Sequence, residues 1–239
     1  MNDAPGLQPL YQQVYTLLVR RIAEGAWRPA EALPSEQMLA SELGVSQGTV
    51  RKALNAMVME KLVERRQGKG TFVAEHTQER ALFQFFRLRR TDGTRVTPES
   101  GVPTIKRRLA KPQERHKLEL DDKAKVVEIR RTRLIDAVPT VAETVVLPLY
   151  LFPDIDEIGD LPNTLYSLYQ SRYGMSVVEA DEQLRVDTAN REDARRLEVE
   201  VGTPLLHIDR IAIAIDGKKV EWRISRLTTN NVVYAVSLS

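Results

Sequence analysis

The chain has 239 residues, of which 42% are hydrophobic, so it is long and apolar enough to form one or two compact domains. It contains no cysteine, which excludes disulfide bonds, thiolate catalysis and cysteine-ligated metal centres, and its net charge of +2 says little about a nucleic-acid partner. No apolar run approaches the roughly 18 residues of a membrane span and the sequence does not open with a secretory pattern, so we expect a cytoplasmic protein with no membrane partner.

The first predicted element is a helix from Pro9 to Glu24, preceded by a frayed end over residues 1–8. Pro9 suits the first turn of a helix, and Gly25 ends it. One apolar stripe recurs at helical spacing: Leu10, Val14, Leu17, Leu18 and Ile22. We expect this helix to complete the core of an N-terminal unit.

Two further helices are predicted around a tight turn. Ser35 can cap a helix that starts at about Glu36, and Gly44 supplies the left-handed residue that ends it. Ser46 can cap a second helix, which runs from Gln47 to about Lys61 with one apolar stripe: Val50, Leu54, Met57 and Val58. A helix, a short turn and a second helix predict a helix-turn-helix.

The exposed side of that second helix and the residues after it suit DNA. Small, amide and cationic residues lie opposite the apolar stripe, as a helix that enters a major groove requires. Val63 to Val73 then reads as two short strands around a basic loop with two glycines, which predicts a wing. Between Gln47 and Val73 six cations stand against two anions, so positive charge is concentrated here.

These motifs resemble the N-terminal domain of GntR-type bacterial transcription regulators. The residues that carry the resemblance are LPSE, GVS, TVRKAL and RRQGKGTFV, within residues 9 to 75. The family commonly has arginine where this chain has Gln37 and Gln47, and since an amide can pair with adenine, we predict a shifted operator sequence. The predicted DNA-binding residues are Ser35, Gln37, Ser46, Gln47, Thr49, Arg51, Lys52, Arg65, Arg66, Gly68, Lys69 and Gly70.

A polar segment separates this unit from the rest of the chain. We predict a winged helix-turn-helix domain over residues 1–75, a linker over 76–84 and a second domain over 85–239. In the second domain the apolar pattern changes mostly to period two, which predicts an α+β fold with an antiparallel sheet. Phe83, Phe85 and Phe86 are expected to pack in its core or against the first domain.

Two consecutive predicted strands place charges on an apolar face. In the strand from Ala124 to Ile135, Arg131 and Arg133 share a face with valine and isoleucine; in the strand from Thr140 to Leu147, Glu143 does the same. A hairpin pairs the two strands. The other face of the first strand, with Glu128, Arg130 and Thr132, is expected to meet solvent. Buried charges need partners, so the three side chains form either a structural ion-pair network or a pocket for a small anion. Two cations against one carboxylate leave a positive charge for such a ligand.

The remaining elements are helices and strands in alternation. We predict a helix over Lys111 to Leu120, a helix start plus helix over Asp160 to Tyr173 with Asn163 or Thr164 as the candidate cap, and a helix over Arg191 to Glu198. Strands are predicted over Leu205 to Ile215, Val220 to Leu227 and Val232 to Leu238, the first two joined by an Asp-Gly turn. If the start of the second of these helices faces the charged interior, its free N–H groups would favour an anion.

This half resembles the UTRA ligand-binding domain that accompanies GntR-type domains in the HutC subfamily, a fold similar to that of chorismate lyase. The resemblance covers about residues 80 to 239 and rests on Arg131-x-Arg133, Leu147-Pro148, Pro204-Leu205-Leu206 and similar short motifs. It implies effector contacts by Arg131, Arg133, Glu143, Thr164, Tyr166 and Glu221. A tyrosine and an arginine-glycine-aspartate run common near the end of family members are replaced here by residues 227–230, so a sugar-phosphate effector is not assumed.

We therefore predict a DNA-binding transcriptional regulator, most simply a repressor that binds a palindromic double-stranded operator as a homodimer and responds to a small anionic metabolite. One alternative is a DNA-binding protein whose second domain only dimerises. Another is an enzyme like chorismate lyase, but the three histidines are scattered and no nucleophile stands beside a base. We expect no catalytic residue, no cofactor and no metal site.

Overall fold

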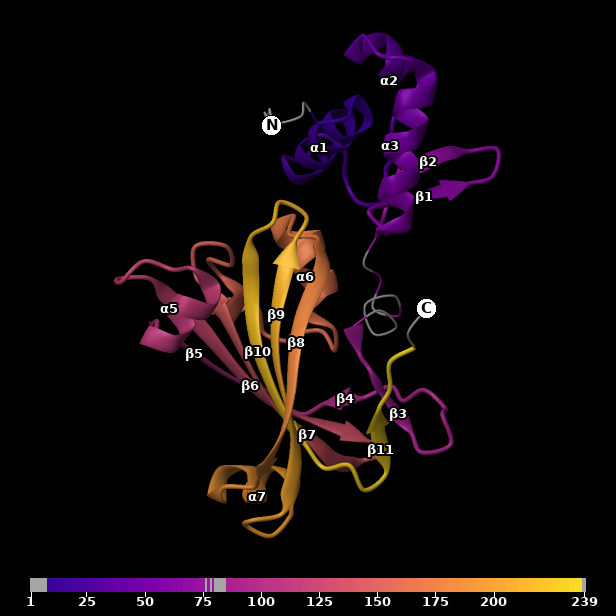
Figure 1. Ribbon diagram of the computed structural model, residues 1–239. Coiled ribbons are helices and arrows are strands. Elements are labelled where there is room, and N and C mark those ends of the chain that lie inside the picture. The colour runs from indigo at the N-terminus through magenta and orange to yellow at the C-terminus, as the bar shows by residue number, and fades with distance from the viewer. Residues whose placement is uncertain (1–7, 76, 78, 80–84, 238–239) are drawn as a thin grey trace, which may run out of the picture.

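The computed structural model describes residues 8–75, 77, 79 and 85–237. A small helical unit at the N-terminus stands beside a larger unit built on a curved sheet (Figure 1). Phe83 and most of the predicted linker lie outside the described residues. Within the described residues, no helix is both long and apolar enough to cross a membrane.

The N-terminal unit has the order predicted for a winged helix-turn-helix. Its helices are α1 (Leu10–Ala23), α2 (Glu36–Leu43) and α3 (Gln47–Met59), and its two antiparallel strands are β1 (Val63–Arg66) and β2 (Gly70–Val73). Helix α2 ends at Gly44, whose φ of 64° is left-handed, as predicted. Helix α3 ends earlier than expected, because Lys61 itself adopts a left-handed φ of 60°.

The core of this unit lies between the three helices and the wing. Its fully buried members include Leu18 of α1, Leu39 of α2 and Val50, Leu54 and Met57 of α3. Leu10 was predicted to join this core but is 50% exposed, because it opens α1 and has no turn above it to cover it. Ala53, not included in the predicted stripe, is fully buried.

The C-terminal unit is built on one seven-stranded antiparallel sheet. Its strands run in the order β4 (Glu99–Ser100), β6 (Lys125–Ile135), β7 (Val138–Pro148), β10 (Lys219–Leu227), β9 (Pro204–Ala214) and β8 (Val177–Thr188), and β5 (Thr104–Leu109) also pairs with β6. The predicted hairpin between β6 and β7 places Arg131 directly opposite Glu143. The strands β5 and β8 were not predicted.

The two faces of the sheet are covered by different elements. Helix α6 (Leu165–Tyr173) packs on one face, over the main core, while α5 (Pro112–Leu118) and α7 (Arg191–Leu197) lie toward opposite ends of the sheet (Figure 1). A short 3₁₀ helix, η1 (Ile155–Glu157), precedes α6. Helix α6 begins at Leu165, and Thr164, one of the two predicted caps, occupies its N-cap position. Residues 160–163 form a bend and an irregular loop before it.

The last predicted strand is shorter than expected and lies outside the large sheet. It is β11 (Val232–Tyr234), and it pairs with β3 (Leu88–Arg90) in a separate two-stranded ribbon instead of joining the large sheet. Leu238, at the predicted end of this strand, lies outside the described residues. The ribbon packs over a second apolar cluster, which includes Leu88, Leu227 and Val232.

Candidate DNA-binding surface and effector cavity

The start of α3 is set by a serine cap that also arranges two predicted DNA-binding hydroxyls. The Ser46 Oγ accepts a hydrogen bond from the backbone N–H of Thr49 at 3.1 Å and lies 2.8 Å from the Thr49 Oγ1. Ser35 caps α2 in the same way, accepting from the N–H of Met38 at 3.2 Å. The two caps fix the turn between the helices and leave Gln47 at the exposed start of α3.

We expect Ser46→Ala to lower the free energy of unfolding by about 1 kcal/mol, because the α3 N–H group loses its acceptor. Ser46→Gly is the matched control and should cost only a few tenths of a kcal/mol. Denaturant titration followed by circular dichroism measures both. An unchanged free energy of unfolding in Ser46→Ala would show that the serine cap does not stabilise α3.

Glu36 joins the helix-turn-helix to the wing. Its carboxylate accepts hydrogen bonds from the Arg51 Nε at 2.8 Å and the Arg65 Nη2 at 3.0 Å, with the Gln47 Nε2 at 3.5 Å. Three predicted DNA-binding side chains, from α3 and β1, therefore gather around one carboxylate. Glu36 was not among the predicted site residues, although it belongs to the LPSE motif.

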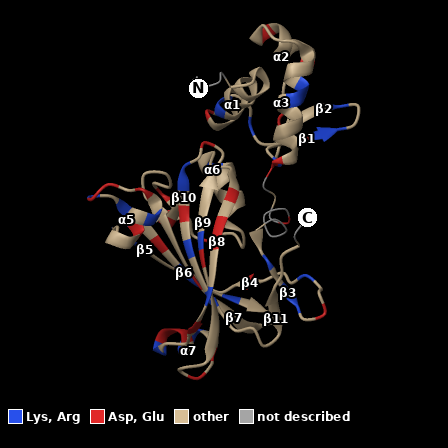
Figure 2. Ribbon diagram, viewed as in Figure 1, with Lys and Arg blue, Asp and Glu red and all other residues tan. Residues whose placement is uncertain are grey.

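The remaining predicted residues of this surface lie on the wing and on the exposed sides of the helices, with Gln37 on α2 and Lys52 on α3. Gly68 and Gly70 take φ values of 68° and 113°, as the wing hairpin requires, and Lys69 lies between them. Arg66 stacks over the Phe72 ring at 4.2 Å and pairs with Glu64. Lys52 lies 4.0 Å from the centre of the Tyr11 ring, so its ammonium group is held toward α1. Figure 2 shows part of the wing strand β1 and part of α3 in blue on this unit.

In the C-terminal unit, the predicted charges are buried together. Arg131 and Arg133 are each 2% exposed and Glu143 is 3% exposed. The Arg131 Nε donates to the Glu143 carboxylate at 2.5 Å, and the Arg133 Nη1 lies 3.6 Å from the same oxygen. The predicted alternation, with both arginines on the core face of β6, is therefore confirmed.

A second acid–base pair, on β10, extends this cluster. Arg223 donates to Glu221 through two nitrogens at 2.9 and 2.7 Å and to the other oxygen of Glu143 at 3.0 Å. Glu221 also accepts from the hydroxyls of Tyr166 at 3.1 Å and Tyr169 at 2.7 Å. Three guanidinium groups thus surround two carboxylates, which leaves one positive charge in excess.

Arg223 was missed, although the same reasoning that found Arg131 could have found it. Glu221 and Arg223 are two residues apart on a predicted strand, so they share a face. The opposite face of β6 was expected to meet solvent, and this was wrong for Glu128, which is 6% exposed. Glu128 lies beneath Arg108 and Arg130 and is ion-paired with both.

The electrostatics of the cluster identify Arg133 as its least compensated member. Burial, together with the neighbouring charges of Arg131 and Arg223, lowers the pKa of Arg133 to about 10, against the opposing effect of Glu143. Burial alone would raise the pKa of Glu143, but the charges of the three arginines hold it well below its usual value. The cluster therefore keeps Glu143 ionised and would gain from an additional anion near Arg133.

A small cavity of about 30 Å³ lies against this cluster, lined by Arg131, Arg133 and Arg223 and by the first turn of α6. Two buried donors, the Arg131 Nη2 and the Arg133 Nε, have no hydrogen-bond partner within the described residues. Thr164 and Tyr166 line the cavity too, so the predicted effector residues are brought together. Glu143 and Glu221 lie behind them and hold the arginines.

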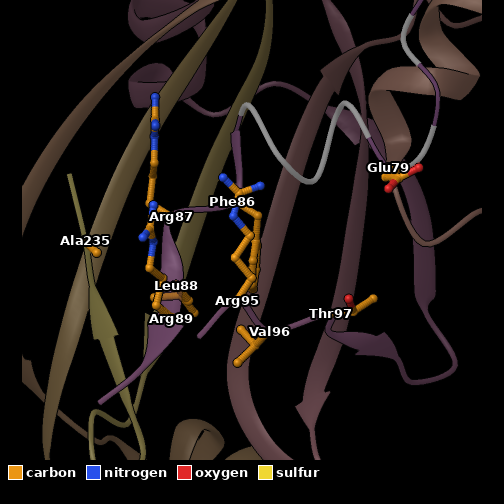
Figure 3. A pocket seen from close by; sticks show the side chains of 9 residues that line it. All are labelled: Glu79, Phe86, Arg87, Leu88, Arg89, Arg95, Val96, Thr97 and Ala235. Atoms are coloured by element: carbon orange, nitrogen blue, oxygen red, sulfur yellow. The ribbon is translucent and has the colours of Figure 1, made fainter. Parts of the chain in front are cut away.

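A second cavity, of about 190 Å³, adjoins the first across Phe86, which lines both. Three arginines line it: Arg87, Arg89 and Arg95 (Figure 3). Arg89 and Arg95 face each other across a short antiparallel bridge. Phe85 lines the small cavity, is buried, and packs edge-to-face on Tyr166 with ring centres 4.9 Å apart. Sequence reasoning placed Phe85 and Phe86 in the core or against the first domain but did not connect them with the cavity.

A basic wing beside a capped helix-turn-helix, joined to a sheet domain with a buried cationic cavity, defines a DNA-binding regulator with a ligand-binding domain. Residues 10–73 match the model of the bacterial regulatory proteins of the gntR family, and residues 93–232 match the UTRA domain. The chain belongs to the GntR family of bacterial regulators with a C-terminal UTRA domain. It is a transcriptional regulator and not an enzyme.

Several named relatives are repressors. The chain is 31% identical to the "Probable fructoselysine utilization operon transcriptional repressor" of Escherichia coli O157:H7, over 92% of this chain and 90% of the relative. It is 29% identical to the histidine utilization repressor of Pseudomonas putida, over 88% of this chain and 84% of that relative. It is 27% identical to the mannosyl-D-glycerate transport/metabolism system repressor of Escherichia coli K12, over 97% of this chain and 96% of that relative.

Solved structures share the fold. The ligand-binding domain of a protein from Bordetella bronchiseptica, described as a GntR-family regulator, matches with a TM-score of 0.62 and 33% identity, over 65% of this chain and 98% of that one. PhnF from Mycobacterium smegmatis matches with a TM-score of 0.58 and 22% identity, over 95% and 99%. The second likeness shows the whole-chain fold alone.

Proposed function

We propose that this regulator is a cytoplasmic repressor that binds a palindromic operator as a homodimer and releases or tightens its hold when a small anion binds the C-terminal domain. We assign residues 1–75 to DNA binding, 76–84 to the linker and 85–239 to effector binding and dimerisation. The predicted DNA-binding and effector-binding residues keep their roles in this proposal. Relatives named as repressors of catabolic operons support the repressor assignment.

The observation that carries the effector proposal is the pair of unpartnered buried donors on Arg131 and Arg133. A buried donor without an acceptor costs free energy, and a bound carboxylate or phosphate oxygen would remove that cost. The excess positive charge of the cluster and the N-terminus of α6 favour an anion at the same place.

The small cavity can hold about one water molecule, so a metabolite needs more room. Phe86 separates it from the larger arginine-lined cavity, and a movement of this one side chain would join the two. The combined site would place the anionic group of the effector on Arg131 and Arg133 and the rest of the molecule toward Arg87 and Arg89.

Helix α6 offers a physical connection between this site and the DNA-binding unit. Its first turn lines the cavity, while Gln170, near its end, donates from Nε2 to the backbone carbonyl of Ala74 at 3.0 Å. Ala74 follows directly after the wing strand β2. An effector that moves the start of α6 would therefore act on the anchor of the DNA-binding unit.

We expect inorganic phosphate, sugar phosphates or small carboxylates to raise the melting temperature of the parent chain and to change its affinity for operator DNA. Arg133→Ala should abolish both effects, because it removes the least compensated donor. Arg172→Ala, an exposed arginine of α6, is the matched control and should leave them intact. Thermal shift, calorimetry and DNA-binding titration give the three readouts.

If Arg131→Ala and Arg133→Ala both preserve every effector response, the cavity is not the effector site. A folded chain that responds to no anion and binds a palindromic site would favour the alternative in which the second domain only dimerises. Selection of bound fragments from random duplex DNA, at a stated salt concentration, tests the operator separately.

A further inference from the structure

Three arginines and a single acid are among the described residues that line the larger cavity. Arg87 and Arg89 are two residues apart along the extended chain at β3, so they lie on the same side of it. Arg95 stands directly opposite Arg89 across an antiparallel bridge, which places it on that side as well. The acid is Glu79, and Figure 3 shows it well apart from Arg87 and Arg89. The described lining therefore carries two more positive charges than negative ones.

The arginines on this side of β3 differ from the arginine beside them in how their charge is compensated. Arg90, the next residue along the strand, binds both oxygens of Asp136, at 2.6 and 2.8 Å. Among the described residues, neither Arg87 nor Arg89 has a carboxylate partner. Arg89 is half-buried, and a like charge directly opposite it across an antiparallel pair is destabilising. The fold therefore keeps a repulsion at the cavity that an anion would relieve.

One aromatic side chain stands between these arginines and the buried cluster. Phe86 lines both cavities, and the Arg133 guanidinium lies 6.0 Å from the centre of its ring. Arginines thus flank Phe86 on two sides, Arg131 and Arg133 in the small cavity and the ribbon arginines in the large one. A ligand that extends past the position of Phe86 would meet both groups.

We propose that the effector carries two separated anionic groups, carboxylate or phosphate, one bound by Arg131 and Arg133 and the other by Arg87 and Arg89. This inference rests on the proposed effector site and names the chemical class of its ligand. The planar guanidinium group matches the geometry of both kinds of anion. A second anionic group tethered to the first binds without a second loss of translational freedom, so it adds directly to affinity. An effector with one anionic group would leave the repulsion between Arg89 and Arg95 in place.

Matched pairs of small ligands test the chemical class. Phosphoglycerate and glycerol phosphate differ by a carboxylate in place of a hydroxymethyl group, and glutarate and pentanoate differ by a carboxylate in place of a methyl group. We expect the member with two anionic groups to bind the full-length chain more tightly in at least one pair, by about tenfold or more. Isothermal titration calorimetry at one fixed salt concentration gives the dissociation constants.

Substitutions on β3 test the second subsite. Arg89→Ala should remove the preference for two anionic groups and leave the affinity for one anionic group close to that of the parent chain. Arg90→Ala is the matched control, because it deletes the same charge from the next residue and should retain the preference. This control excludes a long-range effect of net charge. Arg133→Ala should abolish the binding of both members of a pair.

The ligand-free variants give a readout that separates a ligand subsite from a structural role. Arg89→Ala removes one of two facing like charges, so its melting temperature without added anions should equal or exceed that of the parent chain. Arg90→Ala loses an exposed ion pair and should be unchanged or slightly less stable. A clearly lower melting temperature for Arg89→Ala than for Arg90→Ala would make Arg89 a structural residue and overturn the subsite.

The binding outcomes separate this inference from the function on which it rests. If both members of every pair bind equally, or if Arg89→Ala and R87A/R89A keep the preference of the parent chain, the effector with two anionic groups is overturned and the anion site at Arg133 stands. If neither inorganic phosphate nor any of the four ligands binds, and Arg133→Ala behaves as the parent does, the effector site and this inference are both overturned. A preference that is lost in Arg89→Ala and kept in Arg90→Ala supports the inference.

Discussion

Glu143→Gln should lower the free energy of unfolding of the C-terminal unit by about 3 to 5 kcal/mol, the cost of removing one partner from a buried ion pair. Glu143 binds Arg131 at 2.5 Å and Arg223 at 3.0 Å, and Arg133 lies 3.6 Å away. Without its charge, three buried guanidinium groups share Glu221 alone. Denaturant titration measures the loss, and inorganic phosphate should stabilise the variant more than the parent.

The matched control is Glu192→Gln, which removes an acid from partly exposed ion pairs with Arg130 and Arg196. It should cost at most about 1 kcal/mol. The pKa of Glu143 is lowered in the folded chain, so its stabilising effect is present above its unfolded pKa of about 4.3 and is lost as the pH falls through the folded value. The difference between parent and Glu143→Gln should therefore narrow in acid. Equal stability of the two glutamine variants would contradict the buried network.

Arg51→Ala should weaken binding to the selected operator by about 1 to 3 kcal/mol, or roughly 5- to 150-fold, if Arg51 reaches a base edge. Arg51 is exposed on α3, and Glu36 holds its Nε at 2.8 Å, which limits the orientations of the remaining nitrogens. If Arg51 reaches a phosphate instead, the slope of log affinity against log salt concentration should become shallower by about one unit. Titration at several salt concentrations distinguishes the two.

Lys52→Ala should have the smaller effect, because its ammonium group is held over the Tyr11 ring. Arg20→Ala, an exposed arginine of α1 in the same unit, is the control and should leave affinity within about twofold. Unchanged affinity and salt slope in both Arg51→Ala and Lys52→Ala would mean that α3 is not the helix on the DNA.

The N-terminal unit could be predicted almost completely because its determinants are local. Ser35, Gly44 and Ser46 each act within one turn of their own helix, so the residue type alone indicates a boundary. Similarly, alternation along β6 and β7 predicted the burial of Arg131, Arg133 and Glu143. These three residues of the charged cluster are therefore accessible to sequence reasoning, but the size of the cavity and the place of Phe86 between two cavities are not.

The elements that sequence reasoning missed form because of contacts with residues distant in the sequence. Strand β8 alternates poorly because residues 183–186 are exposed on both faces, and β5 carries three consecutive cations. Neither strand buries enough of its own side chains to produce an apolar period. Arg223 is a different case: the face that it shares with Glu221 could have indicated its burial, but its contact with Glu143, 80 residues away, depends on the register of β7 and β10.

The carboxylate of Glu36 has a consequence for the search along the chromosome. Arg51 and Arg65 are already paired with it before any DNA arrives, so a random duplex must replace a good internal partner with a phosphate. Sequence-independent attraction is then reduced, while a correct site supplies the base contacts that offset the exchange. A protein of this design spends less time on the vast excess of wrong sites, and fewer copies per cell suffice to keep one operator occupied.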